Sequence, residues 1–116
     1  MITVSELVAE LNLNILSGSK GLQKEVTGAY VSDLLSDVMG NAGNGEIWIT
    51  LQTHRNIMAI ASLKDLAAVI LVKGLTPDKD TLEKSEEENI PILGFDDETF
   101  IIAGRLYEVL KQRNIL

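Results

Sequence analysis

The stretch Ala67-Ala68-Val69-Ile70-Leu71-Val72 is an unbroken apolar run, and three of its six residues are the β-branched Val69, Ile70 and Val72. It is far shorter than the run of about 20 apolar residues that a membrane-spanning helix requires. A continuous apolar run of this length is typical of a central parallel strand that is covered on both faces. We therefore predict that residues 67–72 form the middle of a parallel sheet.

Strand and helix patterns alternate on both sides of this run. Toward the C-terminus we predict a helix over residues 76–89 with Pro77 in its first turn, a strand over 90–93 and a helix over 97–113. Toward the N-terminus we predict a helix over 54–65, a strand over 47–49, a helix capped by Asp33, strands over 25–31 and 13–17, and a helix over 4–11. Thr3 and Glu6 form a capping box at the start of that first helix, with Ile2 and Leu7 placed as a hydrophobic staple. This alternation predicts a single-domain α/β fold with three layers, in which a mostly parallel sheet carries helices on both faces.

Composition narrows the functional classes. The chain has 116 residues, enough for one domain, and it has no cysteine, which excludes disulfides and thiolate chemistry. Ten basic against seventeen acidic residues give a net charge of −7, which disfavours binding to a nucleic-acid backbone. There is no signal-peptide pattern at the start and no membrane span, so we expect a cytoplasmic protein without a cofactor.

Two motifs suggest chemistry that the surrounding residues do not support. Gly40 and Gly45 have the spacing of a phosphate-binding loop, but Glu46 and Ile47 stand where that motif needs Lys and then Ser or Thr. The loop also leads from a helix into a strand, whereas phosphates bind where a strand leads into a helix. The single histidine, His54, fits a solvated or capping role, contact with a ligand, or catalysis, and no catalytic or metal-binding partner accompanies it in sequence. We expect the acidic run Glu86-Glu87-Glu88 to be a solvated outer face of its helix.

Polar residues gather where the predicted strands end. In an open parallel sheet, ligands bind outside the carboxyl ends of the strands. The candidate ligand-binding residues at these junctions are Ser32, Asp33, Thr50, Gln52, Thr53, His54, Arg55, Gly74 and Thr76, with Asp96 nearby. Arg55 is the cation of this set and lies near a predicted helix N-terminus, so we expect it to bind an anionic group, with Gln52 to Arg55 and Gly74 to Thr76 sharing one crevice. The alternative is a surface arginine without a partner.

The last predicted helix is apolar over an unusually wide arc. At about 100° per residue, its apolar side chains spread over half of the circumference, whereas packing on one sheet needs a stripe of only about 100°. These side chains are Phe100, Ile102, Ala103, Leu106, Tyr107, Val109 and Leu110. The helix is therefore either deeply set in the domain or paired in part with another subunit.

Several of these stretches together resemble the DRTGG domain family. They are Val26-Thr27-Gly28-Ala29, Ile47-Trp48-Ile49-Thr50, Val69 to Pro77, Ile90-Pro91-Ile92-Leu93 and Asp97-Glu98-Thr99-Phe100, in this order and spacing. The chain looks like the small stand-alone members of that family and is similar to the N-terminal, non-catalytic domain of HPr kinase/phosphorylase. Of the family's signature, taken as Gly-Asp-Arg and Thr-Gly-Gly, this chain has Thr53-His54-Arg55 and Val72-Lys73-Gly74, so only Arg55 and Gly74 match.

The resemblance implies a non-catalytic regulatory module that self-associates. We expect a homodimer that senses a small anion or nucleotide and acts on a separate protein, such as a kinase or a metabolic enzyme. The alternatives are an interaction adaptor with a vestigial ligand site and, less favoured, a small enzyme that uses Asp or Ser residues at the strand ends.

Overall fold

Four of the five strands of the sheet are parallel. The computed structural model describes residues 1–116 and arranges the strands in the order β1-β5-β4-β3-β2. Their bounds are β1 (Asn14–Ser17), β2 (Gly28–Val31), β3 (Glu46–Thr50), β4 (Ala68–Leu71) and β5 (Ile92–Gly94). Strands β2 to β5 pair in parallel with their neighbours, and β1 pairs antiparallel with β5. The apolar stretch from Ala67 to Val72 thus contains β4, which lies at the centre of the sheet.

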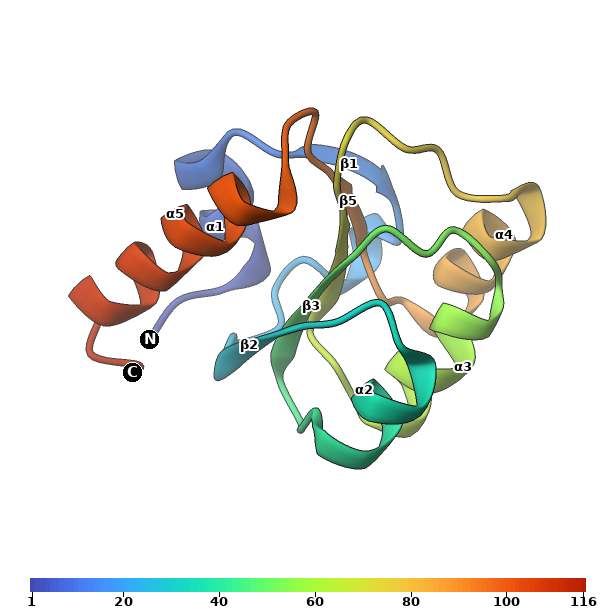
Figure 1. Cartoon of the computed structure of the whole chain (residues 1–116), viewed down its shortest axis with the longest axis horizontal. Coiled ribbons are helices and arrows are strands. Elements are labelled where there is room, and N and C mark those ends of the chain that lie inside the picture. The colour runs from blue at the N-terminus through green and yellow to red at the C-terminus, as the bar shows by residue number, and fades with distance from the viewer.

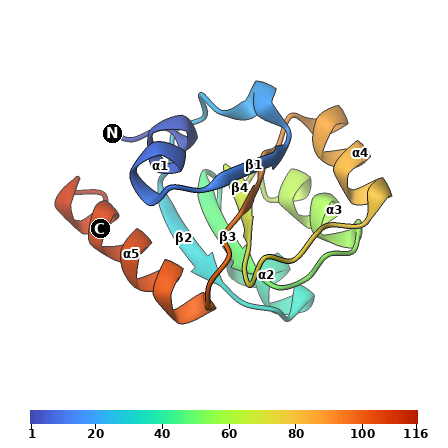
Figure 2. The ribbon, with the colours of Figure 1, turned by 90° about the horizontal axis from the view of Figure 1, so that it is seen from above.

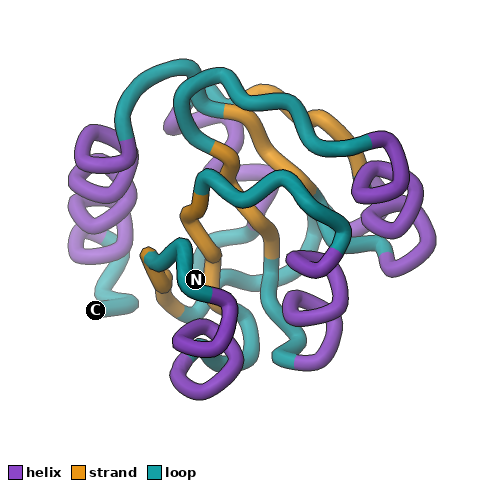
Figure 3. The backbone as a smooth tube through the Cα atoms, turned by 45° about the vertical axis from the view of Figure 1, so that its right-hand side comes forward, coloured by secondary structure: helices purple, strands orange, loops and turns teal.

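Helices cover both faces of this sheet, as the sequence predicts. They are α1 (Val4–Leu11), α2 (Leu35–Asn41), α3 (Asn56–Leu63), α4 (Lys79–Glu88) and α5 (Thr99–Gln112). Each strand from β2 to β5 lies beside the previous one in the same direction, and right-handed crossovers then place α2, α3 and α4 on one face. Helices α1 and α5 cover the other face (Figures 1 and 2). The strands lie between these two helical layers (Figure 3), and no helix is long and apolar enough to span a membrane.

The pleat of β4 divides the core into two halves. Ala68 and Ile70 belong to the apolar cluster under α1 and α5, whereas Val69 and Leu71 belong to the cluster under α2 and α3. All four side chains are buried, which explains why β4 reads as a continuous apolar run rather than an alternating one. Trp48 of β3, the largest of the fully buried side chains, lies in the second cluster.

The first helix begins and ends as predicted. The Thr3 hydroxyl caps α1 by accepting a hydrogen bond from the Glu6 backbone N–H. The Glu6 carboxylate accepts one from the Thr3 backbone N–H, which completes the capping box. Ile2 and Leu7 are both fully buried, as a hydrophobic staple requires.

Two predicted helix starts are wrong, each for a different physical reason. Asp33 does not cap α2; its carboxylate instead accepts hydrogen bonds from the Thr50 hydroxyl and the Leu51 backbone N–H, and Leu34 becomes the N-cap residue. The helix predicted from Thr76 begins only at Lys79, so Pro77 lies ahead of it. Thr76, the residue before Pro77, is disfavoured in the helical conformation. The Asp78 backbone N–H donates a hydrogen bond to the Thr53 carbonyl, and Asp78 stays extended as the N-cap residue.

Candidate functional site

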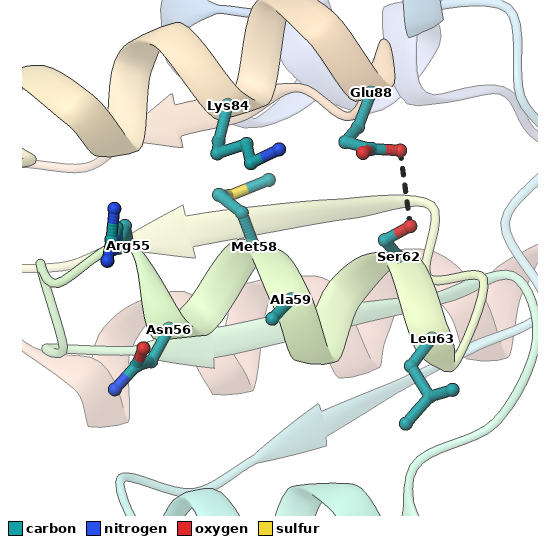
Figure 4. Close-up of a pocket in the computed structure, with 8 residues that line it drawn as sticks. All are labelled: Arg55, Asn56, Met58, Ala59, Ser62, Leu63, Lys84 and Glu88. Atoms are coloured by element: carbon teal, nitrogen blue, oxygen red, sulfur yellow. Dashed lines mark hydrogen bonds between the residues drawn. The ribbon is translucent and has the colours of Figure 1, made fainter.

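The largest cavity is a groove of about 440 Å³ between α3 and α4. It is lined by Arg55, Asn56, Met58, Ala59, Ser62, Leu63, Lys84 and Glu88. Because α3 follows β3 and α4 follows β4, adjacent parallel strands place these two helices side by side on the sheet. The groove begins at the carboxyl edge of the sheet, at Arg55, and extends along the length of α3 (Figure 4).

The two ends of the groove differ in charge. Arg55 lies at one end, as the N-cap residue of α3, and the ammonium group of Lys84 projects over the middle from α4 (Figure 4). At the other end, the Ser62 hydroxyl donates a 3.2 Å hydrogen bond to the Glu88 carboxylate. Met58 and Ala59 lie between the two ends, so α3 presents an apolar surface in the middle of the groove, with the Lys84 ammonium above it.

Both cations of the groove remain available to an external anion. The Arg55 Nε atom is 3.8 Å from Asp80 Oδ2, and the Arg55 side chain is 63% exposed. Lys84 Nζ is 3.1 Å from Glu87 Oε2, and its side chain is 52% exposed. Exposed pairs of this kind contribute little free energy, so a ligand anion can replace either carboxylate at small cost.

Four of the predicted site residues lie close together, and three of them, Asp33, Thr50 and Gln52, bond to one another rather than facing a cavity. Besides its bonds from Thr50 and Leu51, Asp33 accepts a hydrogen bond at its carbonyl from the Gln52 side-chain amide. The Thr50 hydroxyl accepts from the Gln52 backbone N–H, and the Ser32 carbonyl accepts from the Trp48 indole N–H. This network joins the chain segments that follow β2 and β3 and fixes the start of the segment that leads to Arg55.

Thr53 and His54 lie between this network and α3. The Thr53 carbonyl accepts hydrogen bonds from the Thr81 hydroxyl and the Asp78 backbone N–H, which attaches the start of α4 to the loop after β3. His54 is exposed, and its Nδ1 atom accepts a 3.2 Å hydrogen bond from the backbone N–H of Asn56. The side chain of His54 therefore caps the first turn of α3, and its Nε2 atom makes no hydrogen bond within the chain.

Gly74 and Thr76 line a different cavity from Arg55. They belong to a depression of about 170 Å³ near β1 and β5, together with Asp96. The shared crevice expected for Arg55 and Gly74 is therefore absent, because the extended segment before α4 separates them. Gly74 has φ +66° and follows Lys73 at φ +61°, so two consecutive residues adopt the left-handed conformation after β4.

A hydrogen-bonded pair near the network has shifted acid–base behaviour. The Tyr30 hydroxyl donates a 2.9 Å hydrogen bond to Asp37 on α2. Hydrogen bonds from Ser32 and Tyr30 lower the pKa of Asp37 below its ordinary value. The same bond to Asp37 raises the pKa of the Tyr30 hydroxyl, because ionised tyrosine would lose it. This pair fastens α2 to β2 beside the network.

The groove carries charged and hydrogen-bonding groups that can bind a ligand. No group of three or more His, Cys, Asp or Glu side chains is placed to hold a metal ion. Among the residues that line the groove, the only hydroxyl, that of Ser62, donates its hydrogen bond to the carboxylate of Glu88. Arg55 and Lys84 supply charge for an anion, and the Ser62–Glu88 end accepts or donates hydrogen bonds.

Most of the groove could not be predicted from the sequence. Of its residues only Arg55 was among the candidates, and the prediction for Glu86, Glu87 and Glu88 was a solvated outer face. Glu88 bonds to Ser62, and Glu86 accepts a 2.7 Å hydrogen bond from the Gly18 backbone N–H, so two of the three connect elements. The available signal was the placement of consecutive crossover helices on one face, which brings α3 residues spaced three and four apart opposite α4.

Comparison with known proteins agrees with this architecture. The family model of the DRTGG domain matches residues 6–109. Among solved structures, the chain is similar to the CBS and DRTGG domains of the regulatory region of the Clostridium perfringens pyrophosphatase, determined in complex with its activator, diadenosine tetraphosphate. The TM-score is 0.60 at 17% sequence identity, and the match covers 86% of this chain but only 43% of the other. The chain therefore belongs to the DRTGG domain family.

Proposed function

We propose that this chain is a non-catalytic regulatory module that senses a small anionic or nucleotide ligand and acts as a homodimer on a separate protein. The observation that carries the proposal is the position of Arg55. Its guanidinium lies at the N-terminus of α3, at the carboxyl edge of a parallel sheet and at one end of the largest cavity. Ligands of open α/β folds bind at that edge, and a helix N-terminus favours negative charge there.

The size and polarity of the groove support a nucleotide-sized ligand. A volume of about 440 Å³ falls within the range of small-molecule sites. Arg55 and Lys84 would hold phosphate groups, while the apolar middle and the Ser62–Glu88 pair would contact the rest of the molecule. The similar pyrophosphatase region binds diadenosine tetraphosphate, which supports testing nucleotides first.

The proposal is tested by removing the arginine. Arg55→Ala should weaken ligand binding by about 1.5–3 kcal/mol, the range for a hydrogen bond to a charged group. The melting temperature should not change, because the Arg55–Asp80 pair is exposed. Isothermal calorimetry and thermal shift would use phosphate, AMP, ADP, ATP and diadenosine tetraphosphate as probes.

Arg105→Ala is the matched control, since it removes the same charge from α5 on the opposite face of the sheet. Affinity that falls for Arg105→Ala as much as for Arg55→Ala would indicate a general charge effect and contradict the site. If no probe raises the melting temperature of the wild-type protein, the interaction adaptor becomes the better interpretation.

The homodimer is tested separately by sedimentation. The chain has a mass of 12.7 kDa, and we expect twice this mass at micromolar concentration. The support is the exposure of apolar side chains on α5, where Phe100 and Tyr107 are 84% and 57% exposed. A mass of 12.7 kDa throughout the micromolar range would contradict the dimer.

A further inference from the structure

One stripe on the outer face of α5 has the spacing of a helix–helix seam. Phe100, Gly104, Tyr107 and Lys111 are separated by four, three and four residues and lie within about 60° of one another around the helix. Asp97 lies in the segment that leads into this helix, just before its N-cap residue Glu98. All five residues are exposed. Spacing of three and four in alternation is what aligns side chains between two packed helices.

Beside this stripe lies a cavity whose lining is entirely apolar. It has a volume of about 230 Å³ and separates α5 from the edge of the sheet. Its lining residues are Ala29, Val31, Ile49, Ala103, Leu106, Tyr107, Leu110 and Leu116. Val31 and Leu116 are 48% and 53% exposed, so the cavity opens to solvent. Exposed apolar surface next to a cavity of this kind marks an interaction site.

The neighbouring strand, β2, has one free edge. β2 is an edge strand, because it pairs only with β3. Its residues Ala29 and Val31 face the same side as α5 and line the cavity. In Figure 2, α5 lies alongside β2. The strand, the cavity and the stripe thus form one continuous face.

We propose that a second copy of this chain occupies this face, with the two α5 helices antiparallel about a twofold axis at Gly104. This inference rests on the proposed homodimer and is independent of what the α3/α4 groove binds. In an antiparallel pair centred on Gly104, Phe100 of one protomer lies opposite Tyr107 and Glu108 of the other. Each Phe100 ring then enters the apolar cavity of the partner, of which Tyr107 forms one wall.

Two features of α5 make the face complementary to itself. A Cβ atom at Gly104 would meet no atom within 4 Å, so the helix surface there is open and allows a second backbone to approach closely. In the same register Asp97 lies opposite Lys111, and neither makes an ion pair within its own chain. About a twofold axis, the acidic start of each helix lies beside the basic end of the other. The same contact therefore occurs twice, as an isologous interface requires.

The test is sedimentation equilibrium of the full chain and its variants. Phe100→Glu should raise the dimer dissociation constant by about tenfold or more, because aromatic anchors dominate such interfaces. Leu63→Glu is the matched control, since Leu63 is 68% exposed on α3 and far from the proposed face. Both variants should keep the wild-type circular dichroism spectrum, because neither side chain is buried.

A charge exchange tests the antiparallel register. Asp97→Lys and Lys111→Asp should each weaken the dimer, and the double variant should restore it. If the wild-type protein is a monomer, the homodimer itself is wrong. If it is a dimer that Phe100→Glu leaves intact, or one that Leu63→Glu weakens equally, this face is not the interface. If the double variant is weaker than both single variants, the antiparallel register is wrong.

Discussion

Lys73 adopts a backbone conformation that its side chain disfavours. Its φ of +61° lies in the left-handed region, which costs a residue with a Cβ atom about 1–2 kcal/mol. The turn is nevertheless held, because the Lys73 N–H donates to the Asp97 carbonyl and the Gly74 N–H donates to the Phe95 carbonyl. The conformation of the turn at Lys73 and Gly74 is thus fixed by backbone hydrogen bonds.

Lys73→Gly should therefore stabilise the protein. Relief of the left-handed strain exceeds the extra folding entropy of glycine, so the free energy of unfolding should rise by about 0.5–1 kcal/mol. The lost ion pair to Glu98, at 3.6 Å and exposed, contributes little. Urea unfolding would measure the change, with Lys73→Ala as the control that keeps the Cβ atom. A glycine variant no more stable than the alanine variant would show that the strain is relieved elsewhere.

The hydrogen bond between Tyr30 and Asp37 should make the stability of the fold depend on pH in the acidic range. Because the pKa of Asp37 in the folded state lies below its ordinary value of 3.8, the pair stabilises the fold above that pH. The stabilisation should be lost as the pH falls from 3.8 through the folded-state pKa. Tyr30→Phe removes a hydrogen-bond donor, so the Asp37 titration followed by carbon NMR should move upward toward its ordinary value. A midpoint that stays unchanged in Tyr30→Phe would assign the shift to the other donors, Ser32 and Asn41.

At the scale of elements, α4 differs from every other helix in how it is attached. It contributes no apolar side chain to either buried cluster. Its two buried residues, Thr81 and Ser85, are polar, and each is bonded to a neighbouring segment. A helix held by a few hydrogen bonds opens at a lower free energy than one held by apolar packing. Since α4 forms one wall of the ligand groove, its backbone amides should exchange faster than those of α5 and slow when a ligand binds.

Ser85 is the critical attachment of α4. Its hydroxyl accepts a 2.7 Å hydrogen bond from Ser17 and donates a 2.6 Å hydrogen bond to the Ile90 carbonyl. Ser85→Ala leaves both partners unsatisfied in a buried site and should lower the free energy of unfolding by about 1–3 kcal/mol. The exposed Ser62→Ala should change it by less than about 0.5 kcal/mol. Equal effects of the two substitutions in chemical denaturation would contradict this role for Ser85.

Helices and strands could be predicted where the interactions that determine them involve residues close together in sequence. The bounds of α1 could be predicted, because the Thr3–Glu6 capping box lies within the helix itself. The central strand could be predicted because burial on both faces makes it apolar throughout. The start of α2 could not be predicted, because the Asp33 carboxylate accepts hydrogen bonds from Thr50 and Leu51, seventeen and eighteen residues away in sequence. The position of Arg55 beside α4 also depends on contacts between residues far apart in sequence, and no local sequence pattern predicts such contacts.

At the scale of the whole molecule, the two halves of the core share one sheet. Ile70 and Leu71 are neighbours in β4 but belong to different clusters, so neither half can be lost without the strand that serves both. We expect a single cooperative unfolding transition, as is usual for a domain of this size. Fluorescence of the only tryptophan, the buried Trp48, and far-ultraviolet circular dichroism should give the same urea midpoint. Two separate midpoints would show that the halves unfold independently.

The pairing of β1 with β5 has a consequence for how the protein emerges from the ribosome. β1 is translated before the other four strands, yet its only strand partner, β5 (Ile92–Gly94), is translated after all of them. Arg113, which pairs with Glu6 and Glu10 of α1, comes later still. Strands β2, β3 and β4 can pair in the order of their synthesis, but β1 cannot pair until β5 has been translated. Apolar residues of that segment, such as Ile2 and Leu7, are therefore the surface that a nascent-chain chaperone would meet on this protein.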